Sequence, residues 1–352
     1  MKKIILLAAT SVLLIQCNKK IELPELAKDN DYQYFELKDR VCEITQKITL
    51  LEKTKFTIEE KNLKQTFSLE GYLISDSIYK NDQEITEVNT YEKLILPLTK
   101  KQFLSSEKYI LNTIQYDSVH NIVNSKKTTQ KDQMIEEQKN TLSDNYIIRE
   151  DHYISGNAIP NKVIRINRNG DIIKNKTILS QQKQILDSIV YEYNGNQKTK
   201  ESHFNANKKL TGSELYTYSG NNIESILYLD GDGKKIAEEK FKYNKNNQLL
   251  YKYVYNTIDD STYEENILYN KDNKIEKSNS KLNSKVLITT QYEYDNLGNL
   301  IRFETGNFNI NENFVKTIIY TYDKKENWIT KEVSFNNLPT YKVTRTIKYC
   351  NE

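Results

Sequence analysis

The sequence predicts an all-β protein: one long antiparallel meander of about 25-residue β-hairpin repeats, curled into an open barrel or a wrapped shell. Composition gives the first observation, because the 352 residues include 26 Tyr and 40 Asn but only 10 Gly and 4 Pro. Tyr favours strands and Asn favours turns, so many short strands joined by tight turns are expected. The second observation is a repeat of aromatic and turn residues, which gives those turns positions.

The N-terminus has the pattern of an export signal. A basic start is followed by an apolar run over residues 4–15 that is too short to span a bilayer and suits a signal peptide. The run ends at Cys17 and resembles the lipobox of bacterial lipoproteins, in which this cysteine is lipidated and becomes the first mature residue. Gln16 departs from the small residue that the family prefers there. We expect residues 1–17 to be the signal peptide, Cys17 to be lipidated and residues 18–36 to be a tether. An uncleaved anchor or plain secretion is the alternative.

Two further cysteines lie near the two ends of the chain. Cys42 and Cys350 are able to pair in an oxidising envelope, but only if the ends of the sheet meet. Two buried free thiols are the alternative.

The charge balance argues against nucleic acid as a partner. Lys and Arg number 51 against 48 Asp and Glu, and removal of Lys2 and Lys3 with the signal peptide leaves 49 against 48. Electrostatic capture of nucleic acid depends on a clustered excess of basic residues.

An aromatic residue followed by Asn, Asp or Ser recurs along the chain. The most regular copies are spaced by 25, 25, 26, 25 and 28 residues and begin at Tyr193, Tyr218, Tyr243, Tyr269, Tyr294 and Tyr322. Weaker copies keep this phase back to Phe67. We therefore expect degenerate repeats over residues 37–160 and regular ones over residues 161–352, in one continuous sheet of about twenty strands. Residues 131–140 are expected to make a short helix.

Each copy of the motif predicts a hairpin turn. Asn, Asp or Ser opens a type I turn, and four residues after the aromatic comes a residue that tolerates positive φ. These predicted turn residues are Gly71, Gly170, Asn222, Asn247, Asn273 and Gly298. A type I turn closed in this way is a common hairpin loop with a bulge. His120 and Glu326 occupy the same slot without being Gly or Asn, so their turns are expected to be looser or of another type. A second turn recurs between the first ones, as at residues 204–210 and 228–236.

Tyrosines two residues apart put aromatic side chains on one face of the strands and polar ones on the other. Such a row has two interpretations. It is the core of the sheet, or it is a contact surface on which sugar rings stack. The residues proposed for an aromatic contact surface are Tyr251, Tyr253, Tyr292, Tyr294, Tyr320, Tyr322 and Trp328.

The motif resembles the RHS/YD-repeat family and a group of envelope lipoproteins common in the Bacteroidetes. The closest matches are Tyr292-Glu293-Tyr294-Asp295-Asn296-Leu297-Gly298 and Tyr320-Thr321-Tyr322-Asp323. The resemblance covers most of residues 160–349 and, more faintly, residues 35–160. It implies long β-sheets that curl into an RHS-like shell, and it supplies no catalytic residues to transfer.

Signals for catalysis, cofactors or metals are scarce. The three histidines, His120, His152 and His203, lie at least 32 residues apart and are expected to be turn or strand residues. Residues 230–233 alternate Asp and Gly as a calcium loop can, but they fit the second turn better. No nucleophile elbow, phosphate loop or dinucleotide fingerprint occurs. We expect no enzyme activity, no cofactor and no metal.

The leading hypothesis is a non-catalytic cell-envelope lipoprotein, anchored in the outer membrane, that is a binding or structural scaffold for a glycan or protein ligand. Whether it faces the periplasm or the cell surface stays open. One alternative is a glycan-active enzyme that uses a carboxylate pair on the sheet. A weaker one is a toxin-partner or immunity-like protein, which rests on the resemblance alone.

Replacing Cys17 with Ala removes the predicted site of lipidation. We expect this variant to move from the membrane fraction to the soluble fraction after cell lysis, because the diacylated cysteine supplies the anchor. Quantitative blotting of the two fractions measures the shift. Unchanged fractionation would contradict the lipoprotein prediction.

Overall fold

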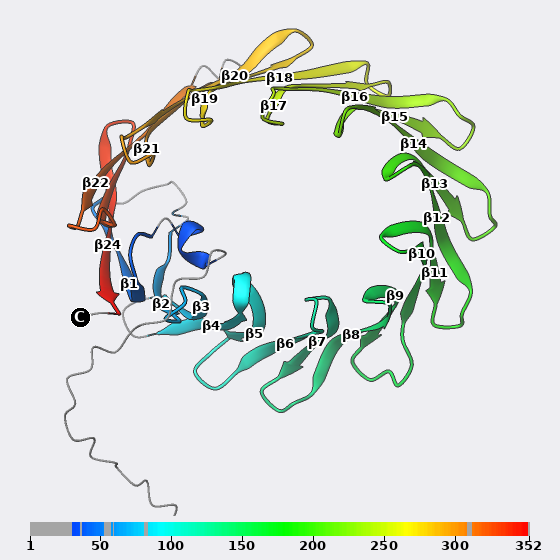
Figure 1. Cartoon of the computed structure of the whole chain (residues 1–352), viewed down its shortest axis with the longest axis horizontal. Coiled ribbons are helices and arrows are strands. Elements are labelled where there is room, and N and C mark those ends of the chain that lie inside the picture. Colours follow the sequence, from blue (N-terminus) through cyan, green and yellow to red (C-terminus); the bar gives the residue numbers. More distant parts are fainter. Residues whose placement is uncertain are drawn as a thin grey trace, which may run out of the picture.

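The computed structural model describes residues 30–35, 37–52, 58, 60–80, 84–307 and 312–350. They form a single 24-stranded antiparallel sheet and two 3-10 helices, η1 (Asp31–Gln33) and η2 (Lys93–Ile95). Each strand pairs with the next along the chain, and β1 (Val41–Leu50) also pairs with β24 (Leu338–Tyr349), so the sheet closes into a barrel (Figure 1). The predicted all-β meander is confirmed, with 24 strands and full closure.

The strands are short and regular. Between β1 and β24 they are β2 (Asn62–Phe67), β3 (Leu73–Tyr79), β4 (Ile85–Glu92), β5 (Leu96–Phe103), β6 (Tyr109–Tyr116), β7 (Ile122–Thr129), β8 (Met134–Ser143), β9 (Tyr146–Ile154), β10 (Lys162–Asn169), β11 (Ile172–Ser180), β12 (Ile185–Asn194), β13 (Gln197–Asn205), β14 (Leu210–Ser219), β15 (Asn222–Asp230), β16 (Lys235–Tyr243), β17 (Leu249–Asn256), β18 (Ser261–Tyr269), β19 (Ile275–Leu282), β20 (Lys285–Tyr294), β21 (Leu300–Asn307), β22 (Glu312–Tyr322) and β23 (Trp328–Phe335).

The repeat unit is one hairpin, so all motif turns lie at the same end of the barrel. They connect even-numbered strands to the next odd-numbered strand, as between β16 and β17 or between β20 and β21. We call this end the motif rim and the other end the opposite rim. The start of β1 and the end of β24 also lie at the motif rim, because the two strands are antiparallel.

The motif turns have the predicted geometry. In residues 244–247 the Asn247 N–H donates to the Asn244 carbonyl (3.0 Å) and the Asn244 N–H donates to the Gln248 carbonyl (2.9 Å). The Asn244 Oδ1 accepts from the Asn246 and Gln248 N–H groups, which explains why Asn or Asp opens the turn. Asn247, Asn273 and Gly298 close their turns with φ of 61°, 60° and 88°. Gly71 and Gly170 have positive φ as well, at 95° and 57°.

Three turn predictions are wrong in detail. His120 (φ 65°) and Glu326 (φ 61°) adopt the same turn as Asn247, with the same pair of backbone hydrogen bonds, so these turns are not looser. Hairpin pairing on both sides holds the backbone in the left-handed region without Gly or Asn. Asn222 lacks positive φ, because the connection there is only two residues long and Asn222 already begins β15. Gly220 (φ 62°) takes the left-handed position instead.

The motif tyrosine links successive hairpins. The hydroxyl of Tyr218 donates to the Lys198 carbonyl (2.9 Å), that of Tyr269 to the Leu249 carbonyl (3.0 Å) and that of Tyr294 to the Ile275 carbonyl (2.9 Å). Each acceptor lies 19 or 20 residues earlier, near the start of the odd-numbered strand of the preceding hairpin. The tyrosine therefore ties its own strand to the hairpin before it, which Phe at this position would not do.

Two other segments differ from prediction. Residues 131–140 form the end of a turn and most of β8, not a helix, because pairing with β7 and β9 overrides the helix preference of the Glu, Gln and Lys residues there. Residues 30–35, at the end of the predicted tether, are folded against the sheet. They include η1, whose Tyr32 is 4% exposed and packs against Ile44, Phe67 and Leu73. No helix among the described residues is long and apolar enough to cross a membrane.

Helix η1 identifies the inner face of the sheet. The blue η1 segment lies inside the ring, next to β1, β2 and β3 (Figure 1). Ile44 and Phe67 belong to the same buried cluster as Tyr32 of η1, so their side chains point inward. Residues paired across strands share a face and successive residues alternate, which identifies the inward residues of every other strand. A second buried cluster lies at β22–β24 and includes Trp328, Val333 and Tyr341. The packed interior is thus concentrated where the two ends of the sheet meet.

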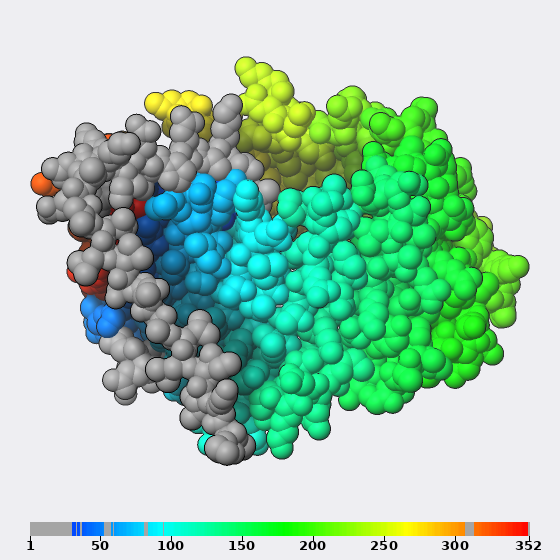
Figure 2. All heavy atoms as spheres, turned by 60° about the horizontal axis from the view of Figure 1, so that its bottom comes forward, coloured from blue at the N-terminus to red at the C-terminus, as the bar shows by residue number. Residues whose placement is uncertain are grey.

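The outer face carries many charged side chains. Ion pairs on it include Lys64 with Glu43, Lys240 with Glu238, and Arg149 with Asp151, at 2.8–3.0 Å. Figure 2 shows the cyan-to-green part of this wall as a continuous surface. Apolar side chains are also exposed on this face, among them Val190, Leu268 and Ile319. The outer wall therefore mixes ion pairs with separate apolar residues.

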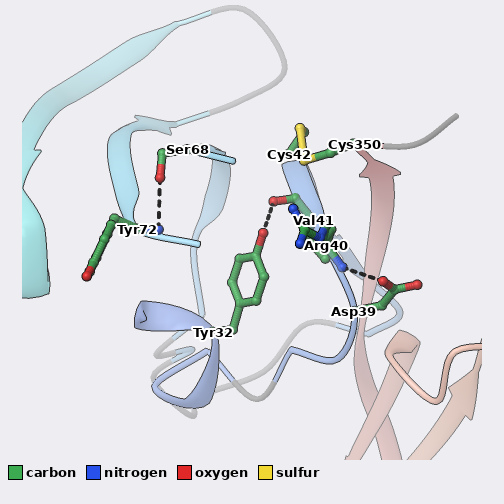
Figure 3. The surroundings of a disulfide bond; sticks show 8 residues. All are labelled: Tyr32, Asp39, Arg40, Val41, Cys42, Ser68, Tyr72 and Cys350. Atoms are coloured by element: carbon green, nitrogen blue, oxygen red, sulfur yellow. Dashed lines mark hydrogen bonds between the residues drawn. A yellow bond between two sulfur atoms is a disulfide. The ribbon is translucent and has the colours of Figure 1, made fainter. Parts of the chain in front are cut away.

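Two kinds of bond lock the seam between β1 and β24. Cys42 and Cys350 form a disulfide with their Cα atoms 5.1 Å apart, so the pairing left open by the sequence is present (Figure 3). Asn327, which is 1% exposed, accepts from the Lys38 N–H (2.6 Å) and donates to the Lys38 carbonyl (2.7 Å). The last motif turn thus holds the segment that leads into the first strand.

Replacing Gly298 with Val tests the motif turn. We expect a loss of stability of roughly 1 kcal/mol or more, because a β-branched residue resists the positive φ at this position. His120→Gly is the matched control, since it places Gly where a non-Gly residue already has φ 65°. Thermal unfolding should show a lower Tm for the first variant and a Tm at or above wild type for the second. Equal Tm values for Gly298→Val and wild type would contradict the turn assignment.

Removing the disulfide tests the seam. We expect Cys42→Ser/Cys350→Ser to unfold at a lower urea concentration, with a loss of about 3 to 5 kcal/mol, because the bond closes nearly the whole chain into a loop. A reductant should lower the wild-type midpoint to that of the variant and leave the variant unchanged. A wild-type midpoint that is insensitive to complete reduction would contradict this role.

Candidate ligand-binding inner wall

The inner wall opposite the seam is lined by tyrosines that are only half-buried. Following the strand register from Ile44 around the ring places Tyr216 inward, opposite Ile226, and Tyr191 inward, opposite Glu201. The half-buried inner-wall tyrosines of β12–β18 are Tyr191, Tyr193, Tyr216, Tyr218, Tyr228, Tyr243, Tyr263 and Tyr269. None of them belongs to either buried cluster. These rings therefore form a wall rather than a closed core.

A charged group lies among these tyrosines on β13 and β14. The Nζ of Lys198 is 2.6 Å from Glu201 Oε2, donates to the Tyr216 hydroxyl (2.9 Å) and lies 4.2 Å from the centroid of the Tyr216 ring. The Tyr216 hydroxyl donates in turn to Glu214. His203 Nε2 lies 3.2 Å from Glu201 Oε1. We call these five residues the Lys198 cluster.

The same pattern continues along the wall. The Tyr228 hydroxyl donates to Glu239 Oε1 (3.3 Å), and Lys252 Nζ lies 3.1 Å from Glu239 Oε2. The Lys252 ammonium also lies 5.6 Å from the centroid of the Phe241 ring. Tyrosine hydroxyls and lysines thus contact inward carboxylates on the same strand or on the neighbouring one.

These contacts set the charges on the wall. Burial raises the pKa of Tyr216, and its hydrogen bond to Glu214 raises it further, to about 12. Burial and the nearby Glu239 raise the pKa of Tyr228 to about 12. Burial lowers the pKa of Lys198, but its hydrogen bonds to Glu201 and Tyr216 outweigh this and leave the pKa raised. At neutral pH the wall therefore presents neutral tyrosine rings and a charged lysine.

Glu201 and Glu214 are the nearest approach to a catalytic carboxylate pair. They lie directly opposite each other on β13 and β14 and both point inward. Lys198 Nζ and His203 Nε2 contact the Glu201 carboxylate, and the Tyr216 hydroxyl donates to Glu214. Both carboxylates are therefore already held by other members of the Lys198 cluster.

A polar part of the inner wall lies on β6–β10. A hollow of about 530 Å³ there is lined mainly by Asn112, Ser125, Lys127, Glu136, Gln138, His152 and Lys162. His152 Nε2 lies 3.2 Å from Glu150 Oε2, so two of the three histidines are inner-wall strand residues paired with a glutamate. His120 is in a turn. The wall therefore offers aromatic groups on one side of the ring and hydrogen-bonding groups on another.

The predicted aromatic contact residues do not form one surface. Tyr292, Tyr294, Tyr320 and Tyr322 are on the inner wall. Trp328 is 7% exposed in the buried cluster of β22–β24, and the Arg345 Cζ atom lies 3.4 Å from the centroid of its ring. Tyr251 and Tyr253 are on the outer wall, because β17 presents its alternate residues Lys252 and Val254 inward. The prediction of a single surface is wrong for this reason.

The remaining site predictions concern metals and the lipid. Residues 230–233 form the predicted turn, with the Gly233 N–H donating to the Asp230 carbonyl (3.1 Å). Among the described residues no group of three or more His, Cys, Asp or Glu side chains is arranged to hold a metal ion. Cys17 lies outside the described residues.

Sequence reasoning missed the Lys198 cluster. A signal for part of it was present: Glu214 and Tyr216 are two residues apart and so share a face of their strand. Lys198 and Glu201 come from the preceding strand, and only the register of β13 against β14 brings them to this pair.

Comparisons with known proteins identify no family. No family model matches the chain, and no curated protein matches it. Among solved structures, TcdB2-TccC3 without its hypervariable C-terminal region is 12% identical, with a TM-score of 0.32. That match covers 86% of this chain but only 19% of the other. A porin-like protein from Bacteroides uniformis is 10% identical over 71% of this chain and 96% of its own, with a TM-score of 0.27. One from Bacteroides vulgatus is 11% identical over 67% and 93%, with a TM-score of 0.21. The resemblance to RHS/YD repeats therefore stays a prediction.

Alkaline titration tests the inner-wall hydrogen bonds. Tyr216 and Tyr228 should ionise near pH 12, about two units above an exposed tyrosine. Because their pKa values are raised by folding, the stability they contribute is complete below pH 10 and is lost as pH rises from 10 towards 12. Tyrosinate absorbance should show a late-ionising component that shrinks in Tyr216→Phe/Tyr228→Phe. An unchanged late component in this variant would contradict the assignment.

Proposed function

We propose that this protein is a non-catalytic cell-envelope lipoprotein whose closed barrel is a binding scaffold, with the ligand held on the inner wall. The observation that carries the proposal is the row of half-buried tyrosines interleaved with the Lys198 cluster. Aromatic rings beside fixed hydrogen-bonding groups are typical of ligand-binding surfaces.

The size of the ring supports space for a ligand. Twenty-four strands about 4.8 Å apart give a circumference of about 115 Å, and hence a diameter of about 37 Å before strand tilt widens it. The side chains of two facing sheets fill a gap of only about 10 Å. Side chains therefore do not fill the barrel opposite the seam, and the inner wall is accessible from within.

The outer wall and the disulfide support the proposed location. The ion pairs on the outer face disfavour burial of the wall in lipid, so a lipid on Cys17 would be the anchor. The bond between Cys42 and Cys350 is of the kind that persists in an oxidising compartment outside the cytoplasm. Both features agree with export directed by the first 17 residues.

Capture from intact cells tests the proposal. The full-length lipidated protein is purified from cell envelopes, and the molecules that accompany it are identified by mass spectrometry. We expect Tyr216→Ala/Tyr228→Ala to retain at least tenfold less of the main accompanying glycan or peptide, since stacking on these rings is lost. Tyr109→Ala, a tyrosine on β6 whose ring lies 3.9 Å from Lys101 Nζ on the outer wall, is the matched control and should retain it fully.

Two outcomes would contradict the proposal. Equal retention by the inner-wall variant and the wild type would remove the inner wall as the binding surface. Conversion of the retained glycan to shorter products by the wild type, lost in Glu201→Gln or Glu214→Gln, would favour the glycan-active enzyme.

A further inference from the structure

Strand β17 is inverted relative to the other tyrosine-rich strands. Its Tyr253 lies opposite Lys240 on β16 and Glu264 on β18, which are outer-wall residues, while Val254 lies opposite the inward Tyr263. Tyr251 and Tyr255 share the outward face of Tyr253. No other strand in the described part of the chain has three tyrosines, so this outward row is a feature of β17 alone.

Lysines from β16 accompany this row. Lys242 Nζ lies 5.3 Å from the centroid of the Tyr251 ring, and Lys240 Nζ lies 5.9 Å from that of Tyr253. Lys240 is 54% exposed and is 3.0 Å from Glu238. Lys242 has no carboxylate of a described residue within ion-pair distance, so its charge is available to a ligand.

The row borders a hollow in the outer wall. The hollow measures about 510 Å³ and is lined by Thr217, Glu224, Ser225, Lys240, Phe241, Lys242, Tyr251 and Tyr253. It combines the two adjacent rings of Tyr251 and Tyr253, two ammonium groups, two hydroxyls and one carboxylate, that of Glu224. The rings lie two residues apart on one strand, about 7 Å, so they present neighbouring platforms along the strand.

This chemistry favours a carbohydrate over a protein. Half-buried tyrosine rings stack on the apolar faces of sugars, and hydroxyl and ammonium groups bind the sugar hydroxyls and any acidic substituent. A stable protein interface covers about 800 Å² on each partner around an apolar centre. Here the wall around the hollow carries charged side chains, including Glu264 opposite Tyr253 and the pair of Glu238 with Lys235 (2.6 Å).

We propose that the outer wall of β14–β17 binds an acidic polysaccharide, with sugar rings on Tyr251 and Tyr253 and carboxylates on Lys240 and Lys242. This site is separate from the proposed inner-wall site, since the two lie on opposite faces of the sheet. It would let the outside of the barrel contact an acidic glycan while the inner wall holds another ligand.

Binding of the full-length protein to polygalacturonate tests this site. Affinity is measured at low and moderate salt against wild type, Tyr251→Ala/Tyr253→Ala and Lys240→Gln/Lys242→Gln. We expect each variant to bind at least tenfold more weakly, and the lysine variant also to lose much of the salt dependence, because it removes two charge contacts. Lys277→Gln/Lys281→Gln, the same change of charge on β19, is the matched control and should bind as wild type does.

Further arms separate stacking from folding and from bulk charge. Tyr251→Phe/Tyr253→Phe should keep near wild-type affinity, since it keeps the rings, and a neutral polysaccharide should bind at least tenfold more weakly. Tyr216→Ala/Tyr228→Ala should bind polygalacturonate normally, which distinguishes this site from the inner wall. Three outcomes would overturn the proposal. The first is wild-type affinity for polygalacturonate in both outer-wall variants, and the second is an equal loss of affinity in the β19 control. The third is binding of polyglutamate as tight as that of polygalacturonate. A tighter interaction with a sulfated polysaccharide than with polygalacturonate would overturn the assignment of carboxylates.

Discussion

The pairing of β1 with β24 is the constraint on which the rest of the structure depends. Each strand of this single-layered sheet pairs with only its two neighbours, so without closure two strands would expose unpaired backbone groups to other chains. The seam carries the features that a closing contact needs: both buried clusters, the Cys42–Cys350 disulfide and the Asn327 bonds to Lys38. Elsewhere the ring has no buried cluster of comparable size among the described residues. Buried side-chain contacts are thus concentrated at the seam, and the rest of the ring is connected to it by strand pairing.

A sheet with no second layer also explains why tyrosine is so frequent. An inward side chain here meets neighbouring rings on one side and open space on the other, so a residue with an apolar body and a polar tip suits it better than Leu or Phe. The hydroxyls are used: Tyr218 and Tyr294 bind backbone carbonyls of the preceding hairpin, and Tyr216 and Tyr228 bind carboxylates. The same side chains that join the hairpins therefore form the surface proposed for the ligand.

Local chemistry was predictable from the sequence, and long-range geometry was not. Asn244, Asn270 and Asp295 open turns through hydrogen bonds to residues two and four positions later, so each turn is encoded within a few residues. The inversion of β17 was not predictable, because Leu250 and Val254 alternate with tyrosines, so both faces of that strand carry apolar side chains. The helix expected at residues 131–140 was wrong for a related reason, since its neighbours decided its structure. Closure and the Lys198 cluster depend on strand register, which no single repeat contains.

The two rims of the barrel differ, and this gives the molecule a direction. The Asp31 N–H donates to the Gly71 carbonyl at the motif rim, so the described chain begins there. Twelve residues lie between Cys17 and Asn30, and the chain from Cys17 to Asn30 reaches at most about 45 Å when fully extended. A lipid on Cys17 would therefore attach through a segment that joins the barrel at the motif rim. The opposite rim, which carries the two longest connections between strands, residues 51–61 and 155–161, would lie at the other end of the barrel from this attachment.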